Sequence, residues 1–225
     1  MILKVGSSGS AVSKIQYKVG EKPDGIFGRG TEANVKLWQE ARGLDADGII
    51  GPGTWKEMFR CSIDDFSPIG IIVHSMTEYI EWEGETITAS QLLENLKLSV
   101  HALIHPDGRI EEIVPASKKA AHAGKSVHNG LTNLNSYFLG YEILVPGIND
   151  FGSFSEKIQT PGCYTDAQFE AAVDLTKEWM NEFDIHVSDV VRHSDVSGDD
   201  VRGDRKGKTD PGIGFNWIEF IKQIS

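Results

Sequence analysis

The stretch IGIIVHSMTEY, residues 69–79, decides the fold because its first half has the composition of a strand buried on both faces. The run from Ile69 to Val73 is β-branched and almost continuously apolar, which is typical of a strand inside a sheet covered by helices. We expect this strand to end at His74, because α/β sheets place functional groups at the carboxyl ends of their strands. His74 is therefore the first candidate for a functional-site residue.

Strand and helix patterns alternate through the rest of this larger part of the chain. Residues 88–98 and 165–183 predict amphipathic helices behind Thr caps, and residues 99–114 predict a hairpin about an Asp-Gly turn. Further strands are expected at 137–147 and 190–193, with a final helix from about Asn216. This mixture predicts an α/β fold with a mixed central β-sheet flanked by helices.

The first sixty residues contain a motif that occurs twice. PDGIFGRGT, residues 23–31, returns as ADGIIGPGT, residues 46–54, so that Asp24 recurs as Asp47 at an offset of 23. Asp-Gly suits a tight turn, and we expect Thr31 and Thr54 to be the N-caps of the helices that follow. Because a fixed offset indicates one structural unit used twice, residues 1–60 are predicted to form a small all-α, three-helix domain.

Composition and charge exclude several classes of partner. The formal net charge is −11. Residues 1–60 contain nine Lys/Arg and seven Asp/Glu and have a formal charge of +2, so the rest of the chain is strongly acidic. Nucleic acid is therefore not expected as a partner, because its phosphates are bound by clustered Lys and Arg.

No apolar run approaches the roughly 20 residues of a membrane span, and the N-terminus shows no secretory signal peptide. We expect no stable membrane insertion, synthesis in the cytoplasm, and free thiols at Cys61 and Cys163.

Two histidines and an aspartate form a candidate metal site. His193 ends the strand pattern VVRH in the same way that His74 ends its own, so the two rings could meet at one edge of the sheet. Catalytic zinc typically has three protein ligands from separate parts of the chain. Asp210, held in the turn KTDPG by Pro211, is the natural third ligand. The Asp- and Gly-rich segment between residues 193 and 210 is then an excursion whose two ends return to one ion.

Glu142 is a carboxylate in the middle of the apolar strand FLGYEILV. Burying it without a partner would cost several kcal/mol. It therefore either faces solvent from an edge strand or acts as a general base with a raised pKa beside a metal-activated water. Lys208, two residues before Asp210, could place its ammonium group beside a developing oxyanion.

Five ordered motifs resemble one enzyme family: IIVHSMT (71–77), VHALIHPDGRIEEIVPASKKAAHAGKS (100–126), NSYFLGYEILV (135–145), VVRHSDVS (190–197) and KTDPG (208–212). The order is similar to that in the type-2 zinc N-acetylmuramoyl-L-alanine amidases, which include phage endolysins and are related to peptidoglycan recognition proteins. The resemblance covers roughly residues 65–224. It implies the following roles: His74, His193 and Asp210 as Zn2+ ligands, Glu142 as catalytic base, Lys208 as transition-state stabiliser and His122 as a substrate-binding residue. Ser75 stands where some members have a second histidine.

The repeated DGIxGxGT turns resemble those of three-helix peptidoglycan-binding modules. Together the two resemblances imply a peptidoglycan-binding domain at 1–60, a linker at 61–68 and a zinc amidase domain at 69–225. The expected activity is cleavage of the amide bond between N-acetylmuramic acid and L-alanine in bacterial peptidoglycan. We expect a monomeric phage endolysin that stays in the host cytoplasm before lysis and then acts on the cell wall.

Other functions stay open at this point. A non-catalytic peptidoglycan recognition protein would share the fold, and a bacterial recycling or lytic amidase would share the chemistry. A glycan-cutting lysozyme would instead need two carboxylates about 5 to 9.5 Å apart. A metallopeptidase would use the same ion, but the sequence has no HExxH helix.

Overall fold

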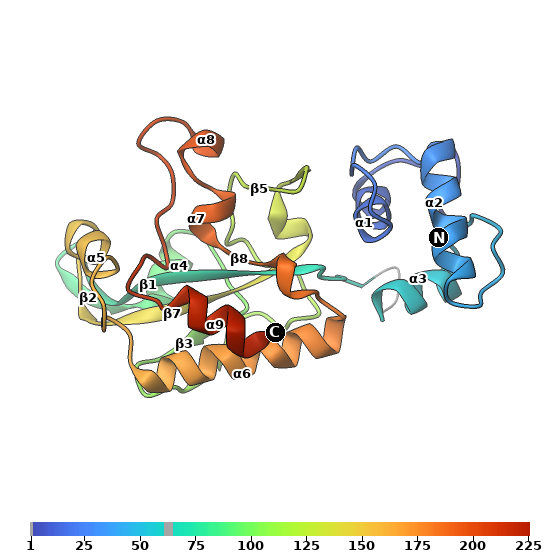
Figure 1. Ribbon diagram of the computed structural model, residues 1–225. Coiled ribbons are helices and arrows are strands. Elements are labelled where there is room, and N and C mark those ends of the chain that lie inside the picture. Colours follow the sequence, from blue (N-terminus) through green and yellow to red (C-terminus); the bar gives the residue numbers. More distant parts are fainter. Residues whose placement is uncertain (1, 61–64) are drawn as a thin grey trace.

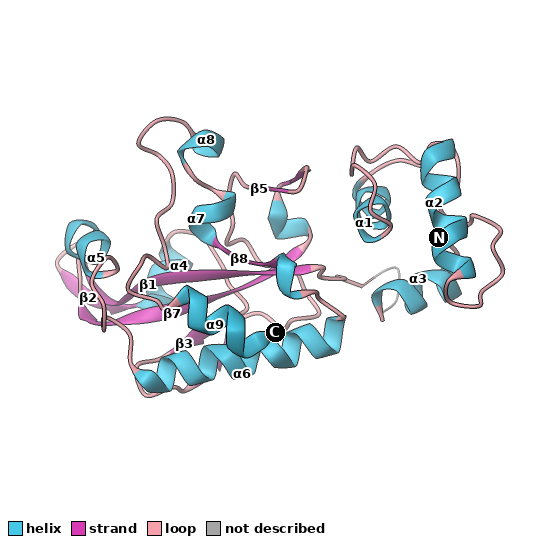
Figure 2. Cartoon of the chain, viewed as in Figure 1, coloured by secondary structure: helices cyan, strands magenta, loops and turns pink. Residues whose placement is uncertain are grey.

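The computed structural model describes residues 2–60 and 65–225, which form a helical N-terminal unit and a larger α/β unit (Figures 1 and 2). Cys61 and the first part of the expected linker lie outside the described residues, whereas Cys163 is a buried free thiol. Within residues 2–60 and 65–225, no helix is both long and apolar enough to cross a membrane.

The N-terminal unit is built on the repeat. Its helices are α1 (Ser10–Lys18), α2 (Arg29–Glu40) and α3 (Pro52–Phe59). The side chain of Gln16 in α1 donates to Asp24 and to the Ile26 carbonyl and accepts from the Gly25 amide. Gln39 in α2 makes the same three bonds to the second turn, 23 residues later, at 2.9 to 3.1 Å. Each glutamine thus ties a helix to the turn that follows it.

The expected Thr caps of this unit are wrong. The N-cap residues of α2 and α3 are Gly28 and Gly51, and neither helix has a side-chain cap hydrogen bond. Thr31 is buried in the first turn of α2, where its hydroxyl accepts a 3.2 Å hydrogen bond from Gln16. The helices begin earlier than expected because the glycines take the extended cap conformation and Arg29 and Pro52 already continue as helix.

The larger unit is built on a mixed six-stranded sheet in the order β2-β1-β7-β3-β4, with β8 also paired to β1 (Figure 2). The pairs β1–β7, β1–β8 and β3–β7 are parallel, and β1–β2 and β3–β4 are antiparallel. The strands are β1 (Gly70–Trp82), β2 (Glu85–Thr88), β3 (Ala102–Ile104), β4 (Ile110–Glu112), β7 (Phe138–Ile148) and β8 (Val190–Arg192), and β5 (Val127–His128) pairs with β6 (Leu131–Thr132) in a separate hairpin.

Helices cover the sheet and bring in the connecting loops. In Figure 1, α6 and α9 lie along one face, while α4, α7 and α8 lie on the other side of the sheet. The helices are α4 (Ala89–Asn95), α5 (Phe151–Lys157), α6 (Asp166–Phe183), α7 (His193–Val196), α8 (Asp199–Arg202) and α9 (Trp217–Ile224), with 3-10 turns at Leu134–Ser136 and Val187–Asp189. Thr88 and Thr165 cap α4 and α6 as expected, each in a capping box with a glutamine. The mixed α/β fold and the helical N-terminal unit predicted from the sequence are confirmed.

Side chains alternate along a strand, so the two faces of β1 and β7 carry different residues. Ile71 and Val73 of β1, like Leu139 and Tyr141 of β7, pack in the core beneath α6 and α9. His74 and Glu142 have the opposite parity, so they lie on the other face, and the register pairs them directly across the two strands. The sheet therefore presents an imidazole and a carboxyl group side by side.

The two units share one hydrophobic cluster, which contains Val12 and Ile15 of α1 together with Ile69, Leu134 and Phe138 of the larger unit. At its rim, the buried Lys14 ammonium donates to the Ser67 carbonyl at 2.7 Å and lies over the ring of Phe66. The N-terminal unit is thus packed against the larger unit near the start of β1 (Figure 1).

Candidate metal site and active-site cleft

The three residues expected to hold a metal come together on the helix α7 side of the sheet. His74 lies inside β1, which continues to Trp82, so the expectation that this strand ends at His74 is wrong. His193 directly follows β8, and parallel pairing of Val73 with Arg192 brings the two rings to a centroid distance of 4.2 Å. Asp210 returns from the loop after α8, where its carbonyl accepts from the Ser194 amide at 3.0 Å.

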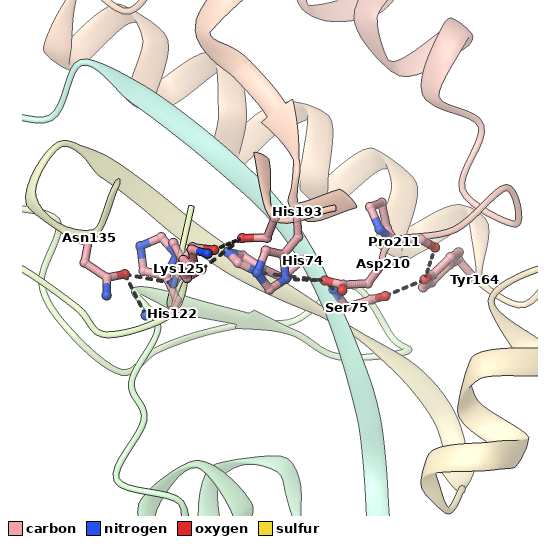
Figure 3. A network of polar contacts seen from close by, with 11 residues as sticks. His74, Ser75, His122, Lys125, Asn135, Tyr164, His193, Asp210 and Pro211 are labelled. Carbon is pink, nitrogen blue, oxygen red and sulfur yellow. Dashed lines mark hydrogen bonds and ion pairs between the residues drawn. The ribbon is translucent and has the colours of Figure 1, made fainter. Parts of the chain in front are cut away.

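The side chains of this cluster are buried and close enough to share an ion. His193 Nδ1 lies 3.0 Å from Asp210 Oδ2, and His74 Nδ1 lies 3.7 Å from the same oxygen. One ligand atom from each residue can be chosen so that all three lie within 4.8 Å of one another. Figure 3 shows the three residues pointing toward a common centre.

Protonation in the cluster suits a divalent cation. Burial, followed by the neighbouring His193 and His122, holds the pKa of His74 well below its usual range. Burial alone would raise the pKa of Asp210, but the His193 ring, the Lys208 ammonium and the Ser75 amide lower it below its usual value. A neutral imidazole and an ionised carboxylate are the states in which these groups bind metal.

Unpartnered atoms distinguish this cluster from an ordinary buried ion pair. His74 Nδ1 and His193 Nε2 are buried without a hydrogen-bond partner. Buried polar atoms are rarely left unsatisfied, so two in one cluster need an explanation. Two imidazoles and one carboxylate are a donor set that zinc accepts while keeping a further coordination position for water. The residues present therefore fit the metal that the sequence implies.

Glu142 is not an edge residue turned to bulk solvent. It lies beside His74 on β7 and lines the same cleft, with its Oε2 atom buried and unpartnered. Burial, and then the nearby charge of Asp210, raises the pKa of its carboxyl group well above the usual range, while Lys208 lowers it. A carboxyl group with a raised pKa beside candidate metal ligands is suited to accept a proton from water and to return it later.

Lys208 and His122 lie on the walls of the same cleft. Lys208 is exposed, and its amide donates to the Ser197 carbonyl at 2.8 Å, which holds the loop against the turn after α7. His122 has both ring nitrogens within hydrogen-bond distance of protein atoms, namely His74 Nε2 at 2.8 Å and the Phe138 carbonyl at 3.2 Å. The predicted contact of His122 with substrate stays a prediction.

Sequence reasoning did not find the support of Asp210. The Tyr164 hydroxyl lies 2.7 Å from the Pro211 carbonyl and 2.8 Å from Ser75 Oγ, and the Ser75 amide donates to Asp210 Oδ2 at 3.3 Å (Figure 3). Tyr164 precedes the Thr cap of α6, and no spacing in the sequence connects it to Asp210. The sequence did indicate that Ser75 would lie near the site, because it directly follows the candidate ligand His74.

The cleft has a volume of about 280 Å³, and its lining combines the polar residues of the candidate site with apolar side chains. The apolar part comes from Leu92 of α4, from Leu96 at the C-cap of that helix, and from Phe151 and Phe154 of α5. Helix α5 was not expected from the sequence, since its seven residues FGSFSEK have no helical period long enough to detect. The cleft can therefore receive a substrate with an apolar or amphipathic part next to the polar centre.

Comparisons with known proteins identify the family of the larger unit. The family model described as N-acetylmuramoyl-L-alanine amidase matches residues 65–213, about two thirds of the chain, and a peptidoglycan-binding domain model matches residues 11–58. The chain is 32% identical over 133 residues to the 1,6-anhydro-N-acetylmuramyl-L-alanine amidase AmpD of Enterobacter cloacae, which covers 59% of this chain and 60% of that protein. It is 27% identical over 183 residues to AmpD of Escherichia coli (strain K12), covering 74% of this chain and 88% of that protein.

A solved structure shows the same fold. The crystal structure of AmpDH3 from Pseudomonas aeruginosa superposes with a TM-score of 0.52 at 24% identity, covering 69% of this chain and 59% of that chain. The match of the amidase model to residues 65–213 places this chain in the N-acetylmuramoyl-L-alanine amidase family, with a peptidoglycan-binding domain ahead of its amidase domain.

Proposed function

We propose that this protein is a zinc-dependent amidase that cleaves the bond between N-acetylmuramic acid and L-alanine in bacterial peptidoglycan. The observation that carries the proposal is the buried cluster of His74, His193 and Asp210 beside Glu142, whose Oε2 atom is buried and unpartnered. A non-catalytic recognition protein would have no need for a buried carboxyl group with a raised pKa. The proposal keeps the sequence-derived roles of these residues.

The protein's own groups divide the reaction between them. A bound zinc ion would supply Lewis acidity, which polarises the scissile carbonyl and lowers the pKa of water. Glu142 takes the proton of the attacking water at its carboxylate and later delivers it to the amine of the departing L-alanine. Lys208, exposed at the cleft wall, places positive charge where the carbonyl oxygen becomes negative.

The bond that is cut identifies the reaction. Purified peptidoglycan is digested with and without a chelator, and new L-alanine amino termini are scored against new reducing sugar ends. We expect amino termini only, and their loss when the metal is removed. New reducing ends that persist with chelator would instead indicate a glycosidase, and cleavage between amino acids of the stem would indicate a peptidase.

We further propose that the enzyme acts on the intact cell wall as a monomeric endolysin. This part rests on the peptidoglycan-binding domain, which a wall-directed enzyme needs and an enzyme for soluble fragments does not. The domain carries +2 of formal charge against the acidic amidase unit, so it is the part suited to approach anionic wall polymers. An endolysin would wait in the host cytoplasm and reach the wall when the membrane is breached.

The rival within the family is a recycling amidase, and the names of the AmpD relatives give its substrate as 1,6-anhydro-N-acetylmuramyl-L-alanine compounds. Release of L-alanine termini from intact sacculi is compared with release from 1,6-anhydro-muropeptides at equal enzyme. An endolysin will favour sacculi, and deletion of residues 1–60 will reduce that preference. Activity confined to the soluble anhydro fragments would overturn the wall-directed role.

A further inference from the structure

A chain of hydrogen bonds runs from the backbone of β7 through His122 to the candidate metal ligand His74. The Phe138 carbonyl lies 3.2 Å from His122 Nε2, and His122 Nδ1 lies 2.8 Å from His74 Nε2. The two rings meet edge to face, with centroids 4.9 Å apart (Figure 3). Both nitrogens of His122 are thus occupied by the protein itself.

The direction of these bonds follows from their fixed end. A carbonyl oxygen can only accept, so His122 Nε2 carries the hydrogen, and a neutral imidazole then has a bare, accepting Nδ1. That acceptor requires His74 Nε2 to donate, which leaves the lone pair of His74 on Nδ1. This is the atom that lies 3.7 Å from Asp210 Oδ2, buried and without a partner in the protein. The chain of hydrogen bonds therefore leaves the lone pair of His74 on the nitrogen that faces Asp210.

The surroundings of His122 are built to hold its ring in place. Its amide and that of Ala123 both donate to Asn135 Oδ1, at 3.0 and 2.8 Å. The ring lies over Gly140 so closely that a Cβ there would be 2.4 Å from Nδ1. The His101 ring also packs against it, with centroids 5.6 Å apart, and accepts at Nδ1 from the Gly140 amide. These contacts hold the His122 ring in one orientation.

We propose that His122 is a positioning residue that fixes the tautomer and orientation of His74, so that His74 Nδ1 is presented to the metal. The inference rests on the proposed function, because it takes the cluster of His74, His193 and Asp210 as the zinc site. It assigns His122 to the ligand rather than to the substrate. Partners of this kind on metal-bound histidines typically change metal affinity by about 10- to 100-fold when removed.

Zinc affinity separates the two roles of His122. The dissociation constant for zinc is measured on the full chain by competition with a chromophoric chelator, for the wild type, His122→Ala and His122→Asn. We expect about 10- to 100-fold weaker binding for His122→Ala. His122→Asn should bind more tightly than His122→Ala, because its side-chain oxygen is as many bonds from the backbone as Nδ1 and can accept from His74 Nε2. His186→Ala, which removes an exposed histidine, should bind zinc like the wild type.

A second readout does not depend on a variant that folds. Long-range proton–nitrogen spectra of the metal-free wild type report which ring nitrogen of His74 carries the hydrogen, and the inference requires Nε2. A hydrogen on Nδ1 would overturn it. So would unchanged zinc affinity in a folded His122→Ala variant whose KM for peptidoglycan rises, since that result would return His122 to the substrate. Failure of the wild type to bind zinc would refute the proposed function, while the tautomer would still be decided by the spectra.

Discussion

Glu142 lowers the stability of the fold at high pH, because the folded protein holds its carboxyl group in a place that favours the protonated form. Its folded pKa is raised, mainly by burial, whereas in the unfolded chain it is near its ordinary value. Below the ordinary pKa both states are protonated and nothing is lost. As the pH rises above it, the unfolded chain ionises first, so the free energy of unfolding falls. This cost accompanies the proposed role as a base.

Replacing Glu142 with Gln will therefore separate stability from activity. We expect turnover of peptidoglycan to fall at least about 100-fold, the usual scale for a lost general base, with zinc still bound. In chelated protein, the stability of the variant relative to the wild type should increase from pH 4 to pH 8, measured by urea denaturation. A difference that stays constant with pH would contradict a raised pKa of Glu142 in the folded protein.

Which single residues could be foreseen depended on whether their roles leave a pattern in the sequence. His74, His193 and Glu142 were recognisable because each interrupts or ends an apolar strand, and the parity of β1 and β7 then places two of them on one face. The bonds of Tyr164 to Ser75 and Pro211 join parts of the chain that only the fold brings together. No periodic pattern in the sequence predicts such contacts.

Among the structural elements, the repeated turns of the N-terminal unit depend on one buried glutamine each. Gln39 is 1% exposed and satisfies the Gly48 amide and the Ile49 carbonyl, so its removal leaves buried backbone groups without partners. Gln39→Ala should lower the free energy of unfolding by about 2 to 4 kcal/mol, since each lost hydrogen bond costs about 1 kcal/mol.

Gln16→Ala should have a similar effect to Gln39→Ala, because the two residues make equivalent bonds. Gln223→Ala is the control, since this exposed residue of α9 bonds only to Glu219 among the described contacts. Thermal or urea denaturation measures all three. A loss at Gln39 no larger than at Gln223 would show that the repeated turns do not depend on these bonds.

Long elements with strong periods were predicted well, and short ones were not. Helix α6 matches its amphipathic pattern and Thr cap, and β7 matches its apolar run. Strand β1 continues beyond His74 because Met76 and Ile80 still pack beneath α4 and β2, although polar residues interrupt the sequence pattern. Helices α7 and α8 have only four residues each, so the loop between His193 and Asp210 could not be told from an irregular one.

For the two units together, the shared hydrophobic cluster implies that they unfold as one. Val12 and Ile15 of the N-terminal unit are fully buried in the cluster that also contains Leu134 and Phe138. Polar contacts around it include the Tyr17 hydroxyl with Asp189 and the Lys18–Asp184 ion pair at 3.1 Å. Separating the units would divide this cluster and expose part of its apolar surface to water, at a cost of roughly 25 cal/mol per Å².

Calorimetry of the full chain should accordingly show one cooperative transition. We expect the calorimetric and van't Hoff enthalpies to agree, as for a two-state protein. Removal of residues 1–60 should lower the Tm of the remaining chain, because it uncovers the Leu134 and Phe138 face. Two well-separated transitions, one of them with the Tm of the isolated amidase unit, would mean that the contact between the units is not stable in solution.

The most direct test of the account is X-ray absorption at the zinc edge on the zinc-loaded protein. We predict one zinc per chain with only nitrogen and oxygen neighbours, including two imidazoles, and the loss of one of the two imidazoles from the scattering in His193→Ala. A sulfur neighbour, a site that survives the combined replacement of His74, His193 and Asp210, or no stoichiometric zinc at all would contradict it.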